Sequence, residues 1–222
     1  MFNAESYVSA LTSRLMETFG ERLSYVGLQG SYLRGEAHEG SDIDIMVVIE
    51  GMTVRDMDQY RSIIQSLENP DKSCGFICSR EDLANWNPLE SFHVLNSTRD
   101  IHGVLSELLP HHTREDIINF AKFSLNNLYH ELCHRYIHAG PEKSAAKLPF
   151  TLKGVFYILQ NVHYLRTGTF IPTKKELLEQ LSGLDRHVLE LSLSLNDSAQ
   201  YDFDASFESV FNWCRETLAS LR

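Results

Sequence analysis

The spacing of the apolar residues changes near Pro110, and this change constrains the fold more than any other feature of the chain. Before Pro110, segments with helical spacing alternate with short segments that have the two-residue period of a strand. After it, apolar residues recur at three- and four-residue steps almost throughout, which is typical of packed helices. We therefore expect an α/β (α+β) domain with a mixed sheet over 1–110 and an all-α helical bundle over 111–222.

The expected elements follow from this pattern and from the capping residues. Gly20 ends a first helix, Thr53 begins another, and Thr113–Asp116 has the pattern of a capping box before a long helix. In the first half we expect helices over 4–19, 53–67 and 79–86, and strands over 24–28, 42–49, 72–78 and 92–96. In the second half we expect helices over 113–140, 142–167, 174–181, 185–195 and 205–221.

The charge of the chain argues against one class of partner. Its 222 residues include 20 Lys and Arg against 30 Asp and Glu, which gives a formal net charge of −10. Because tight, non-specific binding of DNA or RNA needs a basic stripe, we do not expect nucleic acid as a partner. An acidic surface suits a small or cationic substrate, or an anionic substrate that arrives with a metal ion.

Other observations concern the location of the protein. The start of the chain, MFNAESYVSA, lacks the basic and apolar regions of a signal peptide. The longest apolar run, Ile43–Ile49, is far shorter than a membrane span and contains an Asp. We therefore expect a cytoplasmic protein with no membrane partner and with reduced cysteines. Within the strand expected over 72–78, we interpret Cys74 and Cys78 as small core residues and not as a metal site.

Two carboxylates stand two residues apart at the start of the strand expected over 42–49. Residues two apart on a strand point to the same side, so Asp42 and Asp44 share one face, about 6.6 Å apart along the strand. The other face is apolar and packs into the core: Ile43, Ile45, Val47 and Ile49. Carboxylates that repel each other and lose hydration need a cation to neutralise them. Hard oxygen ligands of this kind predict Mg²⁺.

A second motif, Gly30-Ser-Tyr-Leu-Arg-Gly35, lies just before the two carboxylates. Gly30 allows the backbone to approach a phosphate closely, and Ser31 offers a hydroxyl and an N–H group at an expected helix start. One motif therefore suits phosphate and the next suits metal. Together they predict phosphoryl or nucleotidyl transfer.

The order of Gly30-Ser31, Arg34-Gly35 and Ser41-Asp42-Ile43-Asp44 resembles the DNA polymerase β-type nucleotidyltransferase superfamily, whose signature is Gly-Ser followed after an interval by Asp-x-Asp. This resemblance covers roughly residues 24–103. The second half resembles, in architecture alone, the bundle attached to aminoglycoside nucleotidyltransferases and to minimal nucleotidyltransferase/HEPN pairs.

The resemblance implies a site and a reaction. Nucleotide-binding residues would be Gly30, Ser31, Arg34 and Ser41, and the catalytic, Mg²⁺-binding residues would be Asp42 and Asp44. The implied reaction is the Mg²⁺-dependent transfer of a nucleoside monophosphate from a nucleoside triphosphate such as ATP. The acceptor would be a hydroxyl of a small molecule, of the aminoglycoside kind, or of a protein.

This chain departs from the family at the third carboxylate, which usually comes from a strand that follows the Asp-x-Asp strand. The strand expected over 92–96 ends in Asn96 and Ser97, and the nearest acids are Asp100 and Glu90. Either of these could supply the missing carboxylate. If neither does, the alternative is a catalytically weakened or inactive module of the same fold that binds a nucleotide or a partner, as in toxin–antitoxin pairs.

The sequence His130-Glu-Leu-Cys-His134 matches the H-E-x-x-H pattern of zinc proteases. No third ligand follows at a recognisable spacing, so a solvated histidine pair or a pair that faces a cleft fits the sequence better. Ligand sites favour domain interfaces. We therefore expect His130, Glu131 and His134 to line an acceptor pocket that faces Asp42 and Asp44. The sequence leaves open which acceptor and which base are used, and whether the chain forms an oligomer.

Overall fold

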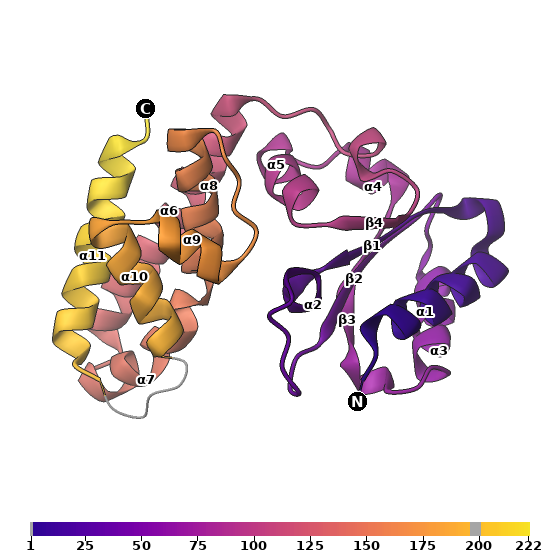
Figure 1. Cartoon of the computed structure of the whole chain (residues 1–222), viewed down its shortest axis with the longest axis horizontal. Helices are drawn as coiled ribbons and strands as arrows, with labels where there is room; N and C mark the ends of the chain where they lie inside the picture. The colour runs from indigo at the N-terminus through magenta and orange to yellow at the C-terminus, as the bar shows by residue number, and fades with distance from the viewer. Residues whose placement is uncertain (1, 196–200) are drawn as a thin grey trace. The chain divides into compact units, whose positions relative to one another are not determined.

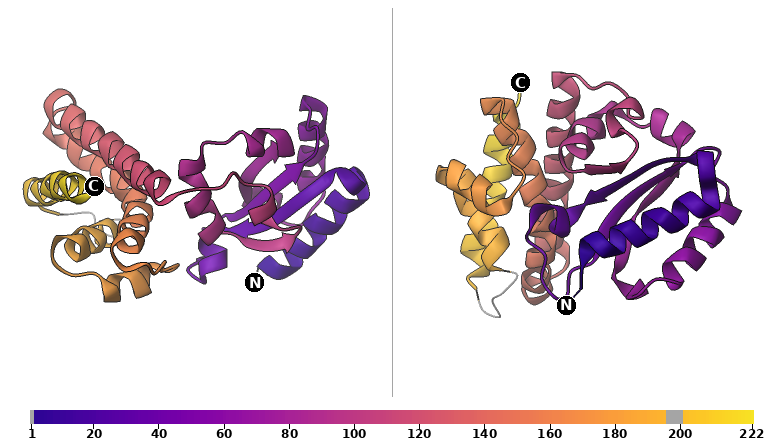
Figure 2. Two further views of the ribbon diagram at one scale, coloured as in Figure 1. Left: turned by 90° about the horizontal axis from the view of Figure 1, so that it is seen from above. Right: turned by 45° about the vertical axis from the view of Figure 1, so that its right-hand side comes forward.

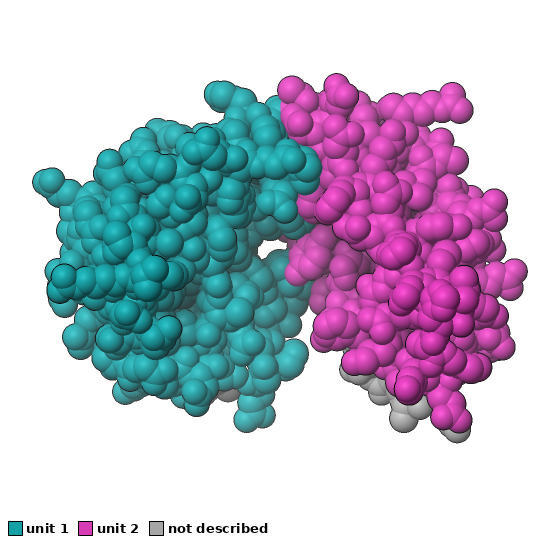
Figure 3. Space-filling view, turned by 180° about the vertical axis from the view of Figure 1, so that it is seen from behind, with its two compact units in different colours: residues 1–112 teal, residues 113–222 magenta. Residues whose placement is uncertain are grey.

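The computed structural model describes residues 2–195 and 201–222. The chain divides into two compact units, Met1–His112 and Thr113–Arg222, which Figure 3 colours separately. The first unit contains a four-stranded mixed sheet with helices, and the second unit is helical (Figure 1). The expected fold class is therefore confirmed. None of the described helices is long and apolar enough to cross a membrane.

The sheet has the strand order β3-β2-β1-β4. Its strands are β1 (Leu23–Gln29), β2 (Ile43–Ile49), β3 (Ser73–Ser79) and β4 (Arg99–His102). β1 pairs antiparallel with both β2 and β4, whereas β2 and β3 run parallel. β2 therefore has a hydrogen-bonded neighbour on each side, which explains why it is the most apolar strand of the chain.

Each face of the sheet packs against a different set of elements. On one face the alternate residues of β2, Ile43 to Ile49, are fully buried in a core shared with α1 (Ala4–Phe19) and α3 (Val54–Gln65) (Figures 1 and 2). On the other face Met46 and Val48 pack with residues of β1, β3, α4 (Arg80–Ala84) and the 3₁₀ turn η3 (Leu105–Glu107). The remaining short elements of this unit are η1 (Gly20–Arg22), α2 (Gly30–Arg34) and η2 (Pro70–Lys72).

The strand expected over 92–96 is wrong, because this segment belongs to α5 (Pro88–Asn96). Asn87 caps this helix by accepting the Leu89 N–H at 3.2 Å, and Pro88 occupies a first-turn position where its missing N–H costs nothing. The last strand of the sheet is instead the four-residue β4, which the sequence pattern does not reveal.

The second unit begins with α6 (Arg114–His138), which confirms the long helix expected there. The single helix expected over 142–167 is wrong. The segment forms α7 (Pro141–Thr151), the 3₁₀ turn η4 (Leu152–Gly154) and α8 (Val155–Thr167). Pro149 lies inside α7 and cannot donate a backbone hydrogen bond, which favours the end of regular helix soon after it. The remaining helices are α9 (Lys174–Gln180), α10 (Gly183–Ser194) and α11 (Phe203–Ser220).

Asp185 connects three helices of this second unit. It lies in the first turn of α10, and its carboxylate accepts the indole N–H of the buried Trp213 on α11 at 2.7 Å. The same carboxylate forms an ion pair with Arg166 on α8. Because both donors reach this one largely buried carboxylate, the last turn of α8, the first turn of α10 and the middle of α11 are held together.

A buried carboxylate holds the start of α3 in the first unit. Asp56 forms a capping box with Thr53, whose hydroxyl and backbone N–H both lie 2.8 Å from Asp56 Oδ2. The guanidinium of Arg22 also donates to Asp56, at 3.3 Å from Nη1 to Oδ2. These donors, Arg22 first and Thr53 second, lower the pKa of Asp56 well below its usual value. Asp56 therefore ties the turn before β1 to the helix after β2.

We expect Asp56→Asn to lower the free energy of unfolding by about 2 kcal/mol at pH 7, because charge-assisted hydrogen bonds are lost. The carboxylate has a lowered pKa in the folded state, so its contribution is present above the unfolded pKa of about 3.9 and disappears as the pH falls through the folded value. Denaturant unfolding at a series of pH values tests this. The difference between the two proteins should shrink below pH of about 4, whereas Asp58→Asn, at an exposed position of the same helix, should change little throughout.

Candidate functional site

Asp42 and Asp44 lie at the start of the central strand. Asp42 is exposed directly before β2, and Asp44 is half-buried on the face of the sheet that carries Met46. Burial raises the pKa of Asp44, and the charge of Asp42 raises it further. A hydrogen bond with Cys74 and the charge of Arg34 act in the opposite direction. The two carboxylates thus interact with each other, as their spacing predicts, in a place where a cation would relieve their repulsion.

Gly30 lies directly against the carboxylate of Asp44. Its φ is +70°, and a Cβ atom added to it would lie 1.8 Å from Asp44 Oδ2. Any side chain at position 30 would therefore displace this carboxylate. The structure thus brings the glycine of the first motif and the second aspartate of the next motif into contact.

Arg34 ends α2 and lies close to the same carboxylate. Its guanidinium donates from Nε to Glu36 Oε2 at 2.8 Å, and only 11% of its side chain is exposed. Its positive charge lowers the pKa of Asp44 and also that of His93 on α5. Ser31 lies one residue into α2, and its carbonyl accepts the Glu36 N–H at 2.9 Å. These contacts fold the turn after α2 back onto the helix.

Ser41 closes the loop that leads into Asp42. Its hydroxyl oxygen accepts the backbone N–H of His38 at 2.9 Å. The ammonium group of Lys72 donates to the carbonyl of Ser41 at 3.1 Å and also to the carbonyl of Glu39. Ser41 and Lys72 therefore fix the loop against the start of β3, and a contact of Ser41 with nucleotide stays a prediction.

Neither expected source of a third carboxylate lies on a strand beside β2. Asp100 lies on β4, which β1 separates from β2, and its Oδ1 accepts the Tyr25 hydroxyl at 2.7 Å. Two strand spacings amount to about 10 Å, which is too far for a shared ion. Glu90 lies in the first turn of α5. Among residues 2–195 and 201–222, no three His, Cys, Asp or Glu side chains converge on a possible metal position.

The strand that follows Asp-x-Asp in this fold is β3, and Cys74 is its residue in register with Asp44. The interpretation of Cys74 as a core residue is wrong, because it is exposed, whereas Cys78 is buried as expected. Its thiol lies close enough to Asp44 for the two groups to influence each other's pKa, and partial desolvation together with this carboxylate raises the pKa of the thiol. The sequence contains a signal for this position, since Cys74 stands at the start of an expected strand, just as Asp44 does.

His93 is a second residue near the site that sequence reasoning missed, because its segment was expected to be a strand. It lies on α5, where burial and then the nearby Arg34 lower its pKa to about 4. The imidazole is therefore neutral at pH 7 and can both donate and accept a hydrogen bond.

The residues of the expected acceptor pocket lie on α6 in the second unit. Glu131 accepts from Arg135 at 2.8 Å and from the Thr151 hydroxyl at 2.9 Å, and it lines a cavity of about 290 Å³. His130 and His134 are exposed, with ring centroids 6.0 Å apart. Their proposed position opposite Asp42 and Asp44 stays a prediction.

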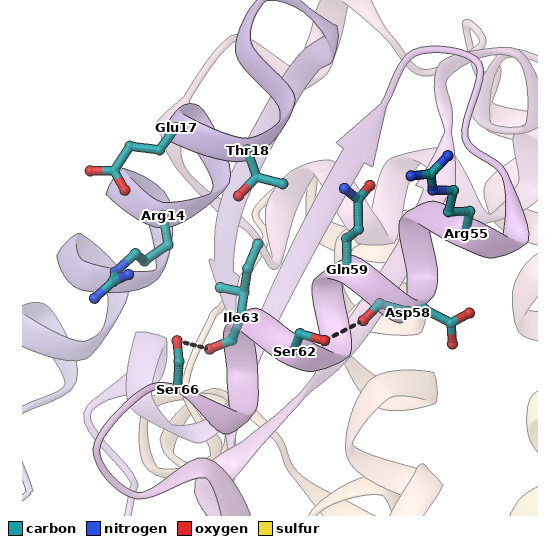
Figure 4. A pocket seen from close by; sticks show the side chains of 9 residues that line it. All are labelled: Arg14, Glu17, Thr18, Arg55, Asp58, Gln59, Ser62, Ile63 and Ser66. Carbon is teal, nitrogen blue, oxygen red and sulfur yellow. Dashed lines mark hydrogen bonds between the residues drawn. The ribbon is translucent and has the colours of Figure 1, made fainter.

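A larger hollow, of about 490 Å³, lies between α1 and α3 (Figure 4). Charged side chains of both signs border it, among them Arg14, Glu17, Arg55 and Asp58. Because α1 and α3 cover the face of the sheet opposite to Asp44, this hollow is not part of the carboxylate site.

Comparison with known proteins agrees with this geometry. The family described as "Nucleotidyltransferase domain" matches residues 14–124. A protein adenylyltransferase MntA from Thermococcus cleftensis is 34% identical over 87 residues, which are 39% of this chain and 78% of that protein. The crystal structure of the spectinomycin adenyltransferase AAD(9) from Enterococcus faecialis with ATP and spectinomycin has a TM-score of 0.59. That match is 16% identical and covers 98% of this chain and all of the other, so it shows a shared fold.

The contact between Gly30 and Asp44 predicts a difference between two glycine substitutions. Gly30 and Gly35 have nearly the same positive φ, +70° and +69°, but a Cβ at position 35 would meet no atom within 4 Å. We expect Gly35→Ala to destabilise the protein by about 1–2 kcal/mol through backbone strain alone. Gly30→Ala should cost about 1–3 kcal/mol more, because Asp44 must move. Equal losses in denaturant unfolding would contradict the close packing of Gly30 and Asp44.

Proposed function

Because this chain belongs to the family of nucleotidyltransferase domains, we propose that it transfers a nucleoside monophosphate, AMP in the first instance, from its triphosphate to an acceptor hydroxyl. The observation that carries this proposal is the packing of Asp44 against Gly30, with Asp42 on the same strand end. The carboxylate pair therefore lies next to Gly30, a backbone position that has no side chain. A phosphate can approach such a position closely.

The donor set fits a magnesium ion. Asp42 and Asp44 offer hard carboxylate oxygens at an accessible strand end, and Mg²⁺ commonly takes one or two carboxylates and completes its shell with water and substrate phosphates. When bound, the ion would neutralise phosphate oxygens and make an acceptor hydroxyl more acidic. We propose both aspartates as its protein ligands.

The other residues of the site would bind and orient the nucleotide. Gly30 leaves room for the Asp44 carboxylate, Ser31 offers a hydroxyl, and Arg34 brings a positive charge toward the phosphates. Ser41 and Lys72 hold the loop that carries Asp42. In the transfer, the acceptor hydroxyl loses its proton to solvent water and its oxygen bonds to the α-phosphorus. The bond from that phosphorus to the oxygen that bridges to the β-phosphate breaks, and pyrophosphate leaves. The contribution of the protein is thus mainly positioning and charge.

We propose a small cationic molecule, such as an amino sugar, as the acceptor, and a protein hydroxyl as the alternative. The net charge of −10 supports a cationic substrate. Within the second unit by itself, Glu131 and Tyr157 line a cavity with a carboxylate and an aromatic ring, which is a lining that suits a cation. The alternative has support as well, because the MntA relative is named a protein adenylyltransferase. His130 and His134 remain candidates for further acceptor contacts.

A second candidate function is a nucleotide-binding module with little or no transfer activity. Cys74 favours it, since a thiol stands where the strand after Asp-x-Asp would supply a carboxylate. Such a module would still bind ATP with Mg²⁺. The two functions therefore differ in turnover and not in binding.

The test is incubation of the full chain with α-³²P-labelled ATP, GTP, CTP or UTP and Mg²⁺, with an aminocyclitol or aminoglycoside or with a cell lysate. We expect labelled acceptor with at least one nucleotide, and loss of labelling when EDTA removes the cation. Asp42→Asn and Asp44→Asn should each lower the rate by about 100-fold or more, because the charge that holds the cation is reduced.

Asp58→Asn is the matched control, since Asp58 is an exposed carboxylate on the opposite face of the sheet. It should leave the rate unchanged. Asp42→Asn should leave the melting temperature unchanged or raised, because one of two repelling charges is gone. A protein that binds ATP but labels neither small molecules nor proteins would favour the non-catalytic module.

A further inference from the structure

We propose that Cys74 sets how tightly the Asp42–Asp44 pair holds its divalent cation, and that the thiol makes this binding dependent on bound nucleotide. The proposal rests on the proposed function for the identity of the site, but it concerns cation affinity and not turnover. Cys74 lies outside both sequence motifs, and under this proposal it determines how much charge the protein offers at the carboxylate pair.

The position of Cys74 follows from strand register. In the parallel pair of β2 and β3, Asp44 is matched with Cys74, Met46 with Phe76 and Val48 with Cys78. The later pairs pack together on one face of the sheet, so the first pair points to that face as well. Parallel neighbours lie about 4.8 Å apart. The influence of Cys74 and Asp44 on each other's pKa agrees with this placement.

Two contacts keep Cys74 at this position. The next residue, Gly75, has a φ of +142°, and a Cβ added to it would lie 2.0 Å from the Ile45 carbonyl oxygen. The backbone of β3 can therefore lie this close to β2 only because residue 75 is glycine. Lys72, two residues before Cys74, donates to the carbonyl of Ser41, the residue that precedes Asp42. The backbone positions of Cys74, Asp42 and Asp44 are therefore fixed relative to one another.

A thiol at this place does little for a magnesium ion. Sulfur is a soft ligand, whereas Mg²⁺ prefers hard oxygen ligands. In the described part of the chain no third acidic, histidine or cysteine side chain joins Asp42 and Asp44 to form a metal position. The protein therefore offers two charges and two ligating groups. The phosphates of a nucleotide must supply the rest.

The test replaces the thiol with a carboxylate of similar size and measures Mg²⁺ binding by calorimetry, with and without a non-hydrolysable ATP analogue. Cys74→Asp is compared with the wild type and with Cys74→Asn, which has the same shape but no charge. Without nucleotide, we expect Cys74→Asp to bind Mg²⁺ about 10-fold or more tightly than Cys74→Asn, and Cys74→Asn to match the wild type within about threefold. The analogue should tighten Mg²⁺ binding far more for the wild type than for Cys74→Asp.

Equal affinities of Cys74→Asp and Cys74→Asn for Mg²⁺ would overturn the proposal. So would a wild type that already binds Mg²⁺ tightly without nucleotide. A further readout is thermal unfolding, because a third carboxylate should lower the melting temperature in EDTA and Mg²⁺ should restore it.

If Cys74→Asp does not fold, the charge can be added to the folded protein instead. Iodoacetate converts the exposed thiol to a carboxymethyl group, and iodoacetamide gives the uncharged amide of the same size. The experiment uses Cys133→Ser, because Cys133 is only partly buried. Tighter Mg²⁺ binding by the carboxymethyl protein supports the proposal, and equal binding by the two adducts contradicts it.

These outcomes are separate from failure of the proposed function. If no variant transfers a nucleotide but Cys74→Asp binds Mg²⁺ more tightly than Cys74→Asn, the role of Cys74 stands and catalysis is wrong. If the wild type transfers AMP and the two variants bind Mg²⁺ equally, catalysis stands and the role of Cys74 is wrong.

Discussion

The first unit depends on the burial of the apolar part of β2. This strand has paired neighbours on both sides and packed elements on both faces, so every residue from Ile45 to Ile49 is excluded from solvent. A charged side chain could not be accommodated in that stretch without a partner. Asp42 and Asp44 occur at the start of the strand, where Asp42 is exposed and Asp44 is half-buried. The same burial that stabilises the sheet therefore also limits the place where its chemistry can occur.

Charge near the carboxylate pair is balanced locally, in a chain that is acidic overall. Arg34 is engaged with Glu36, and Lys72 with backbone carbonyls of the loop before Asp42. These cations organise the protein around the site, and the charge that Arg34 would bring to a triphosphate is already shared with Glu36. A soluble divalent ion is the simplest source of the missing positive charge. This explains how an acidic protein could bind a highly anionic nucleotide.

Local sequence patterns predicted the helices and strands whose formation depends mainly on neighbouring residues in the chain. The period of two located β2 with Asp42 and Asp44 at its start, and helical spacing with capping residues located α1 and α6. Where prediction failed, one cause was local and the other was not. The segment Phe92–Asn96 has an apolar content that suits either a strand or a helix, and the cap at Asn87 decides between them. The role of Cys74 depends on β3 being parallel to β2, and the order of strands in a sheet cannot be read from either strand alone.

The two tryptophans of the chain fall one in each unit, which gives the protein two separate intrinsic fluorophores. Trp213 is fully buried, and its indole N–H is bonded to Asp185, whereas Trp86 is partly exposed and packs against Phe76 with ring centroids 4.9 Å apart. Emission from a buried, hydrogen-bonded indole should differ in wavelength from that of a partly solvated one. Tryptophan fluorescence, with Trp86→Phe or Trp213→Phe as references, can therefore follow the loss of structure in each unit without any added label.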